Sequence, residues 1–348
     1  MFVKAPDQRR GSDTKHGRND MGQQPHEQLW RLATAAVVSR SLQVAAELGV
    51  ADHMGDAPVS VKELASACEA DAGALDRILL LLCAHGVFER KGEGFGHTDV
   101  SRLLRSEHPM SMRAFPRMMG MASFRDSFSQ LEHSVRTGRP AFDLIDGEGV
   151  FAHLQRHPEE ARIFGASMTA KAAADIGALL DAYDFTRFAT IADIGGGNGH
   201  LLRAVLDAVP DANGILFDLP SVVESIDIDT PRLVLHAGDF FADALPSADA
   251  YILMEVIHDW DDPQAAAILS AVSRAASPGA TVLIIEAVLD DRHVDPVVHT
   301  LDVIMLAITG GHERTQAQLS QLLDSAGLHV NSVHETRGAL RVVEAVAG

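Results

Sequence analysis

The sequence predicts an α/β fold, in which a doubly wound parallel sheet follows an N-terminal helical domain of winged-helix type. After Phe188, short apolar segments with strand character alternate with helical patterns, as in parallel strands joined by helices. Before that position the patterns are almost entirely helical. A chain of 348 residues can bury one large core and a second, smaller one, so we expect two structural units.

Four segments are expected along the chain. They are a flexible tail, a winged-helix domain, a helical connecting region that lines a ligand pocket, and the α/β domain, at residues 1–24, 25–109, 110–185 and 186–348. The tail lacks the continuous apolar stretch of a secretory signal, and Met21 is an alternative start. The most apolar stretch, residues 78–88, is about half of the ~20 residues that a bilayer span needs. We therefore predict a cytoplasmic protein without a membrane segment.

The charge and cysteine content exclude several classes of protein. The chain has 48 acidic and 29 basic residues, a formal charge of −19, which repels nucleic acid and anionic membranes. Its two cysteines, Cys68 and Cys83, have neither CxxC nor metal-ligand spacing. We therefore expect no metal site and no disulfide framework.

The N-terminal domain begins with a helix from residue 25 that ends before Gly49, a residue suited to a left-handed C-terminal cap. Apolar residues recur along one face of this helix: Leu29, Leu32, Ala36, Val37, Val44 and Leu48. Ser60 and Asp71 can cap two further helices, and two short strands surround a Lys-Gly-Glu-Gly turn at 91–94. Helices followed by such a hairpin are typical of a winged helix.

A winged helix either binds DNA or packs against another protein chain. The helix at 71–85, which would read DNA, carries one base, Arg77, against two acids. It would neutralise phosphates poorly, so a dimerisation module that binds no nucleic acid is favoured.

Methionine and phenylalanine residues are concentrated in the helical region that follows. Most of them belong in a core, and a few could line a pocket for a flat aromatic ligand. They are Met118, Met119, Met121, Phe124, Phe128, Phe142, Phe151, Phe164 and Met168.

Five parallel strands are predicted at 190–194, 214–218, 233–237, 250–257 and 281–287. The last two apolar segments, separated by a short turn at 337–338, should form an antiparallel hairpin at the sheet edge. Ligands of such sheets bind at the carboxyl ends of the strands, where the topology reverses. The residues at these ends are therefore the candidate site.

The first strand runs into a glycine-rich turn, "IADIGGGNGH" at 191–200. A dinucleotide fingerprint that starts with Gly195 and Gly197 needs a third glycine where the chain has His200. Asp193, two residues before Gly195, would repel a pyrophosphate but suits a ligand with an ammonium and a sulfonium. The turn therefore favours S-adenosylmethionine over a nicotinamide dinucleotide.

Acidic residues also end the next two strands. Asp218, 19 positions after Gly199, is placed to accept hydrogen bonds from both ribose hydroxyls of an adenosine. Asp239 could accept from the adenine amino group, and Phe240 could pack on the ring. Each acid alone could instead cap a helix, but three acids at three successive strand ends are harder to explain as caps.

The fourth strand ends in "YILMEVIHDWDDP", which supplies a candidate general base. Asp261 or Asp262 can cap the helix that Pro263 begins, but this explains neither His258 nor Trp260. Histidine takes a proton near neutral pH, and ionising a phenol at pH 7 costs about 4 kcal/mol. Glu286, predicted at the end of the fifth strand, and Glu313, in the loop "GGHERT" with Arg314, could orient the histidine.

These motifs together resemble the caffeic acid and hydroxyindole O-methyltransferase family. The match is carried, in the family's order and spacing, by "IADIGGGNGH", "FDLP", "GDFF", "HDWDD", "IIEAVL" and "LDVIMLAITGGHERT". It covers nearly everything after residue 24, and secondary-metabolite methyltransferases of actinobacteria are most similar. The resemblance implies a Rossmann-like class I methyltransferase domain, an N-terminal winged-helix dimerisation domain and a homodimer.

The resemblance also implies roles for single residues. The catalytic set is His258 as base, Glu286 and Glu313 as its orienting acids, and Asp259 beside it. The cofactor site is Asp193, Gly195, Gly197, Asp218, Leu219, Asp239, Phe240 and Met254. The acceptor site is Phe164, Met168, Ile304 and Met305. Plant members have a lysine where this chain has Met254, and their segment before "GGHERT" is longer, so the adenine environment and the substrate rim differ here.

The predicted function is methylation of a hydroxyl group, of phenolic type, on a small aromatic or polyketide-like molecule. Three alternatives remain at this stage. The chain could bind the same cofactor for hydroxylation or decarboxylation, it could be a winged-helix regulator that senses the cofactor, or it could be a nicotinamide-dependent oxidoreductase.

Overall fold

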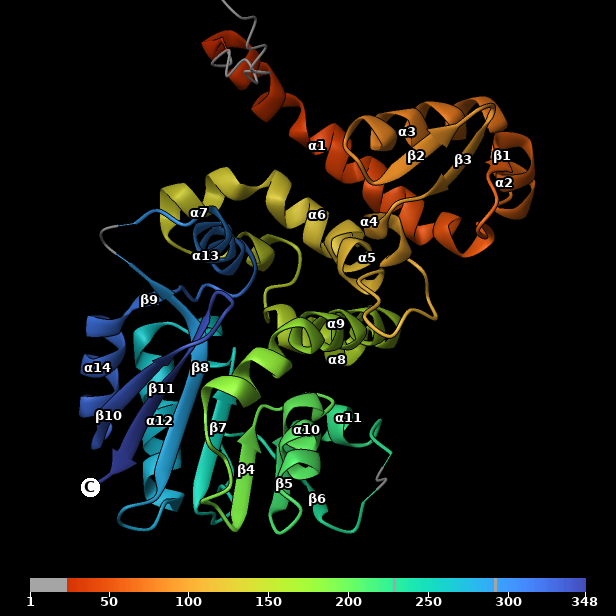
Figure 1. The fold of residues 1–348 in the computed structure, drawn as a ribbon. Coiled ribbons are helices and arrows are strands. Elements are labelled where there is room, and N and C mark those ends of the chain that lie inside the picture. Colours follow the sequence, from red (N-terminus) through yellow and green to blue (C-terminus); the bar gives the residue numbers. More distant parts are fainter. Residues whose placement is uncertain (1–23, 228–229, 291–292) are drawn as a thin grey trace, which may run out of the picture.

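The computed structural model describes residues 24–227, 230–290 and 293–348. The predicted tail up to residue 23, with the alternative start at Met21, lies outside this part of the chain. Figure 1 shows an N-terminal helical domain, a middle layer of helices and a C-terminal α/β domain, one after another.

The N-terminal domain has the predicted winged-helix arrangement. Its elements are α1 (Pro25–Glu47), η1 (Val50–His53), β1 (Val59–Ser60), α2 (Val61–Ala67), α3 (Ala72–Ala84), β2 (Phe88–Lys91), β3 (Gly94–His97) and α4 (Asp99–Arg102). Gly49 follows α1 with φ 67°, and the side chains of Ser60 and Asp71 accept hydrogen bonds from the N–H groups of Glu63 and Ala74. The wing gains a strand that was not predicted, since β1 pairs with β3.

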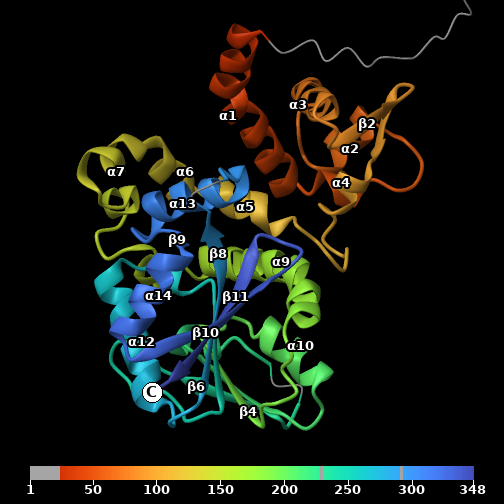
Figure 2. The ribbon, with the colours of Figure 1, turned by 60° about the vertical axis from the view of Figure 1, so that its left-hand side comes forward.

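Only the C-terminal half of α1 packs on its own domain. Ala45 and Ala46 are buried, whereas Leu29, Trp30 and Leu32 are 69%, 72% and 64% exposed. The first turns of α1 extend away from the rest of the chain (Figure 2). The predicted apolar face therefore lies open over these turns in a single chain instead of facing a core.

Helices fill the layer between the two domains. They are α5 (Ala114–Gly120), α6 (Ala122–Ser129), α7 (Leu131–Thr137), η2 (Ala141–Leu144), α8 (Val150–Arg156) and α9 (Pro158–Ala182). Phe124 and Phe142 meet edge to face at 6.2 Å in a core that also buries Met118 and Met121. Most of the predicted methionines and phenylalanines thus pack together, as expected.

The α/β domain contains a mixed sheet with the strand order β10-β11-β8-β7-β4-β5-β6. Its strands are β4 (Thr190–Ile194), β5 (Asn213–Asp218), β6 (Leu233–Ala237), β7 (Ala250–Met254), β8 (Thr281–Leu289), β10 (Leu328–Glu335) and β11 (Leu340–Ala347). Strands β4, β5, β6, β7 and β8 are parallel, and the β10–β11 hairpin is antiparallel at the edge. The predicted sheet and hairpin are confirmed.

Two predicted strand ends were wrong. β7 stops at Met254, because Glu255 has a positive φ of 53° and the chain turns into η3 (Ile257–Asp259). β8 continues past Glu286 to Leu289, because the short β9 (Arg314–Thr315) pairs with its last residues.

Helices cover both faces of the sheet: α10 (His200–Ala208), α11 (Pro220–Val223), α12 (Asp262–Ala275), α13 (Pro296–Ile308) and α14 (Gln316–Ser325). On one face, Ile268 of α12 and Leu323 of α14 share a core with the sheet. On the other face, Leu202 of α10 packs with Leu179 of α9. The central strands are therefore buried on both sides, and ligands can reach them at their carboxyl ends.

No single helix of the described residues is both long and apolar enough to span a membrane. The two parts of α9, Pro158–Ala173 and Asp175–Ala182, meet these criteria only when they are combined across a 46° bend.

Candidate active site

A cavity of about 1810 Å³ lies at the carboxyl ends of the central strands. Residues from α8, α9 and the segment 106–117 also line it, so it reaches into the middle layer. The chain leaves β4 for β5 and β6 and then returns to β7 on the other side of β4, which makes the loops after β4 and β7 neighbours. Pockets for one small molecule typically measure roughly 300–1,000 Å³, so this cavity has room for two ligands.

The glycine-rich loop after β4 forms one wall of the cavity. Gly195 and Gly197 have φ angles of 70° and 56°, which other residues rarely adopt. A Cβ atom on Gly196 would lie 2.4 Å from Leu216 Cδ1 and 2.6 Å from Asp193 Cγ. The loop therefore lies directly on the Asp193 side chain, and any side chain at position 196 would push it away.

Asp193 is buried beneath this loop with an unsatisfied charge. Its side chain belongs to a residue that is 2% exposed, and Oδ1 has no hydrogen-bond partner among the described residues. Burial, with a contribution from the Asp218 charge, raises the pKa of Asp193 to about 7. Such a carboxylate fits a cationic ligand group, as the ammonium and sulfonium of S-adenosylmethionine provide.

Asp218 and Asp239 line the same cavity. Asp218 accepts hydrogen bonds from the N–H groups of Gly197 (2.8 Å) and Leu219 (2.7 Å), which fix its carboxylate beside the glycine loop. Burial raises the pKa of Asp218, against these two hydrogen bonds. Asp239 accepts from the N–H of Phe241 at 2.8 Å and so forms a local turn. No described helix begins at this residue, so the interpretation of this acid as a helix cap was wrong.

An aromatic wall continues from these acids. The ring of Trp260 lies 5.8 Å from Phe240, edge to face, and 5.5 Å from Phe151, with which it stacks at 24°. All three rings line the cavity, as does Met254. Phe151 was predicted only as one of the aromatic residues that could line a pocket. It was not assigned to the site, because no local pattern indicates that α8 meets the loop after β7.

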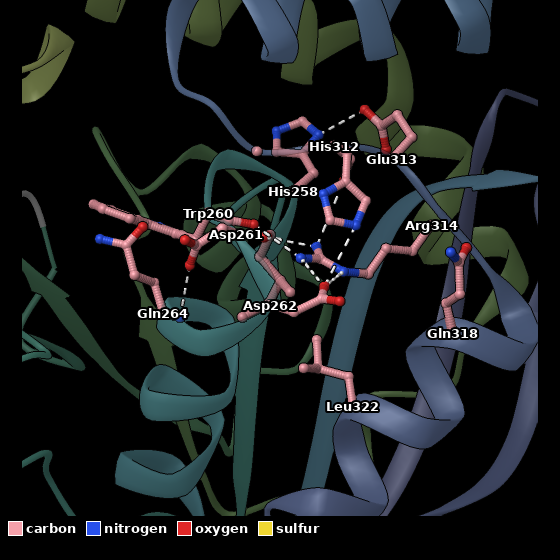
Figure 3. Close-up of polar contacts among 12 residues, drawn as sticks. His258, Trp260, Asp261, Asp262, Gln264, His312, Glu313, Arg314, Gln318 and Leu322 are labelled. Carbon is pink, nitrogen blue, oxygen red and sulfur yellow. Dashed lines mark hydrogen bonds and ion pairs between the residues drawn. The ribbon is translucent and has the colours of Figure 1, made fainter. Parts of the chain in front are cut away.

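His258 lies on η3, directly beyond β7 (Figure 3). It is 4% exposed, and its Nδ1 lies 2.8 Å from Oε1 of Glu313. Its backbone N–H donates to Oε1 of Glu286 at 2.9 Å, and its Nε2 lies 3.9 Å from Oδ1 of Asp259. The structure thus brings the four predicted catalytic residues together, although Glu286 lies within β8 and not at its end.

The acids of this cluster determine its proton affinity. Burial lowers the pKa of His258, but the hydrogen bond to Glu313 and the charges of Asp259, Glu313 and Glu286 outweigh it and raise the pKa to about 10. Burial also raises the pKa of Asp259 to about 6 and that of Glu286 to about 7. Nδ1 is engaged by Glu313; His258 itself is not among the residues that line the cavity, whereas its neighbour Asp259 is.

The predicted acceptor residues fall into two groups. Phe164 and Met168, on α9, line the cavity. Ile304, on α13, packs behind them in the same apolar cluster, and Met305 contacts Thr309. Neither Ile304 nor Met305 is among the cavity-lining residues.

An ion pair in the cavity wall, with side chains 23% and 13% exposed, was not predicted from the sequence. Lys171, on α9, pairs with Glu255, whose side chain lines the cavity next to Met254. Lys171 and Glu255 are 84 positions apart, and the sequence shows neither the left-handed backbone of Glu255 nor its partner. Within the described residues, no group of three or more His, Cys, Asp or Glu side chains could hold a metal ion.

The sheet has a parallel core with this strand order and an antiparallel hairpin at its edge. Acidic residues surround a glycine loop that lacks the third glycine of a dinucleotide site. This is the arrangement of class I S-adenosylmethionine-dependent methyltransferases. The fold and the site define an enzyme of this class. Residues 30–107 match the O-methyltransferase dimerisation domain, and residues 128–329 match the O-methyltransferase domain. The chain belongs to this O-methyltransferase family and is an S-adenosylmethionine-dependent O-methyltransferase.

Individual relatives are similar to this chain over almost its whole length. The phenazine O-methyltransferase of Lysobacter antibioticus is 37% identical over 91% of this chain and 95% of its own length. Human N-acetylserotonin methyltransferase in complex with S-adenosylmethionine superimposes with a TM-score of 0.88 at 28% identity, covering 94% of this chain and 99% of the human one. An O-methyltransferase from neocarzinostatin biosynthesis, solved with S-adenosylmethionine and 2-hydroxy-5-methyl naphthoic acid, gives 0.78 at 33% identity, covering 94% and 100%.

The buried Asp193 should give the cofactor-free protein a characteristic pH dependence. Because its pKa is raised in the folded state, the Asp193 carboxyl keeps its proton to higher pH in the folded chain than in the unfolded chain. The free energy of unfolding therefore decreases as pH rises from about 4 to about 7. Over this interval the loss approaches about 4 kcal/mol, at about 1.4 kcal/mol per unit. Asp193→Asn has no such group, so the melting temperature of the variant minus that of the wild type should increase as pH rises from 5 to 8. A difference between the two proteins that is constant with pH would contradict the assignment.

Proposed function

We propose that the enzyme methylates a phenolic hydroxyl of a small aromatic or polyketide-like molecule, with His258 as the general base. The observation that carries this proposal is the His258–Glu313 contact of 2.8 Å beside a cavity with room for two ligands. The naphthoic acid in the neocarzinostatin-pathway relative supports an aromatic hydroxy acid as one acceptor type.

The proton affinity of the base suits a phenol. A phenol has a pKa near 10, whereas an unperturbed histidine has one of about 6.5, so proton transfer to an ordinary histidine is uphill by about 5 kcal/mol. The acids around His258 raise its pKa to about 10, which makes the transfer to Nε2 nearly balanced. Because this pKa lies above 7, the fraction of His258 in the neutral form that a base requires, and with it kcat, should rise with pH.

We propose that the cofactor occupies the part of the cavity next to the glycine loop. Asp193 would face its cationic groups, Asp218 its ribose and Asp239 its adenine amino group. Phe240 and Met254 would contact the ring, and the backbone at Gly195, Gly197 and Leu219 would lie against it. When bound, S-adenosylmethionine supplies an electrophilic methyl group; the chain contributes orientation, exclusion of water and removal of the acceptor proton.

On the acceptor side, we propose that Phe164 and Met168 pack on the flat face of the ring. Ile304 and Met305 would act from behind, by supporting these two side chains. Asp259, which lines the cavity beside His258, would accept a hydrogen bond from a second polar group of the acceptor.

The acceptor proposal is tested with S-adenosylmethionine labelled in its methyl group. The purified enzyme is incubated with hydroxynaphthoic acids, hydroxybenzoic acids and polyketide phenols, and with matched compounds in which an amine replaces the hydroxyl. We expect the label on the phenolic oxygen of at least one acceptor, assigned by mass spectrometry and NMR. Label found only on nitrogen or carbon would overturn the proposal.

We propose that two chains associate through the N-terminal domain, as its match to a dimerisation domain suggests. Leu29, Trp30 and Leu32 on α1 would supply apolar surface for the contact. Light scattering of the protein eluting from a size-exclusion column should give the mass of a monomer for the double variant Leu29→Glu/Leu32→Glu and the mass of a dimer for the wild type. Lys62→Glu, elsewhere in the domain, serves as the control. A double variant that stays dimeric would place the interface elsewhere.

We also propose that the enzyme works in the cytoplasm and binds neither nucleic acid nor membranes. The formal charge of −19 supports this, because it disfavours polyanionic surfaces.

A further inference from the structure

Arg314 is the bulkiest of the fully buried side chains in the described structure, with 1% exposure. Its guanidinium has five N–H donors, and the structure provides an acceptor for each of them. Nε and Nη2 donate to Oδ1 of Asp262, at 3.0 and 2.8 Å. Nη2 also donates to the carbonyl of Trp260 at 2.8 Å, and Nη1 donates to those of Ile257 and His312, at 3.1 and 3.5 Å.

Two of these acceptors lie on either side of the catalytic turn. Ile257 begins η3 and Trp260 follows it, so Arg314 holds the backbone immediately before His258 and immediately after Asp259. Figure 3 shows the guanidinium between this turn and the start of α12. The preceding residue, Glu313, holds the ring of His258 itself.

Gly311 provides a second contact between the same loop and the turn. A Cβ atom at this position would lie 2.0 Å from the carbonyl oxygen of His258 and 2.4 Å from the carbonyl carbon of Asp259. Both partners are backbone atoms, which cannot rotate away as the end of a side chain can. The loop therefore packs directly on the outside of η3, and only glycine permits this distance.

We propose that Arg314 is a positioning residue that sets the location of the catalytic base, with Gly311 as the contact against which the turn is held. This inference rests on the proposed role of His258. Arginine suits this function because its planar fork binds two carbonyls and a carboxylate at fixed angles, which the single ammonium of lysine does not reproduce. A shift of the base by about 1 Å is expected to cost on the order of 100-fold in turnover.

The test compares Arg314→Gln and Arg314→Lys with Asp262→Ala. We expect both Arg314 variants to lower kcat on the order of 100-fold while the Kd for S-adenosylhomocysteine stays within about 3-fold. Lysine should not restore activity, although it keeps the charge and so preserves folding best. Asp262→Ala removes the carboxylate, which is 67% exposed, but leaves the three carbonyl contacts of Arg314, so it should lower kcat less than either Arg314 variant does.

The pH profile separates positioning from simple stabilisation. If Arg314 maintains the His258–Glu313 contact, its loss weakens the interaction that raises the pKa of His258. The acidic limb of kcat, where the base becomes protonated, then moves to lower pH. Gly311→Ala should reproduce the fall in kcat with the Arg314 side chain retained, because the loop must move away from the turn to make room for the added Cβ. Folded Arg314 variants with wild-type kcat and an unchanged pH profile would overturn the proposal. A His258→Ala variant with full turnover would instead overturn the proposed function itself.

Discussion

Replacing His258 with alanine should lower kcat by about 100- to 10,000-fold, the usual contribution of a positioned general base. The variant loses the imidazole whose Nε2 is proposed to take the acceptor's proton. Binding of S-adenosylmethionine should change little, because the His258 side chain contacts Glu313 and Asp259, which are not among the residues proposed to hold the cofactor. Single-turnover kinetics and calorimetry measure the two effects separately.

The control for this variant is His329→Ala. His329 lies exposed on β10, and its ring contacts the exposed Asp324, so its loss should leave kcat unchanged. If His258→Ala retained the turnover of the control, the base assignment would be wrong. A loss of cofactor affinity equal to the loss of turnover would show that His258 acts in binding.

Replacing Asp218 with alanine should weaken S-adenosylmethionine binding by about 100-fold or more, because hydrogen bonds to a charged group contribute about 1.5–3 kcal/mol each. The carboxylate also holds the N–H groups of Gly197 and Leu219, so the glycine loop should become less ordered. The measurement is the Kd from calorimetry, with Asp207→Ala on the exposed side of α10 as the control. An unchanged Kd for Asp218→Ala would remove Asp218 from the cofactor site.

The parts of the fold that the sequence predicted well depend on local physical chemistry. Ser60 and Asp71 cap the helices that follow them because their side chains reach an N–H three residues away. The sequence after β4 is rich in glycine because the chain turns tightly onto Asp193 there, which leaves no room for a side chain at position 196. The parallel strands are continuous apolar runs because both of their faces are buried.

The parts that were missed depend on contacts between distant segments. The stack of Phe151 on Trp260, the pair of Lys171 with Glu255 and the contacts of Arg314 all join elements that only the tertiary fold brings together. The end of β7 was predicted too late because "EVIH" is apolar enough for a strand, while the backbone of Glu255 turns to present His258.

The open face of α1 shows a different limit. Leu29 and Leu32 have the helical spacing of core residues, and the spacing is the same whether the partner surface belongs to the same chain or to a second one. The exposed fractions of these side chains in a single chain, and not their periodicity, distinguish the two cases.

Varying the acidity of the acceptor tests whether His258 removes the proton from a phenolic hydroxyl. The ratio of wild-type to His258→Ala turnover is measured at pH 8 for one accepted phenol and for a nitro-substituted analogue that is largely ionised at this pH. An ionised acceptor needs no base, so we expect the defect of the variant to fall by at least about 10-fold with the analogue. An equal defect with both acceptors would show that His258 does not remove this proton.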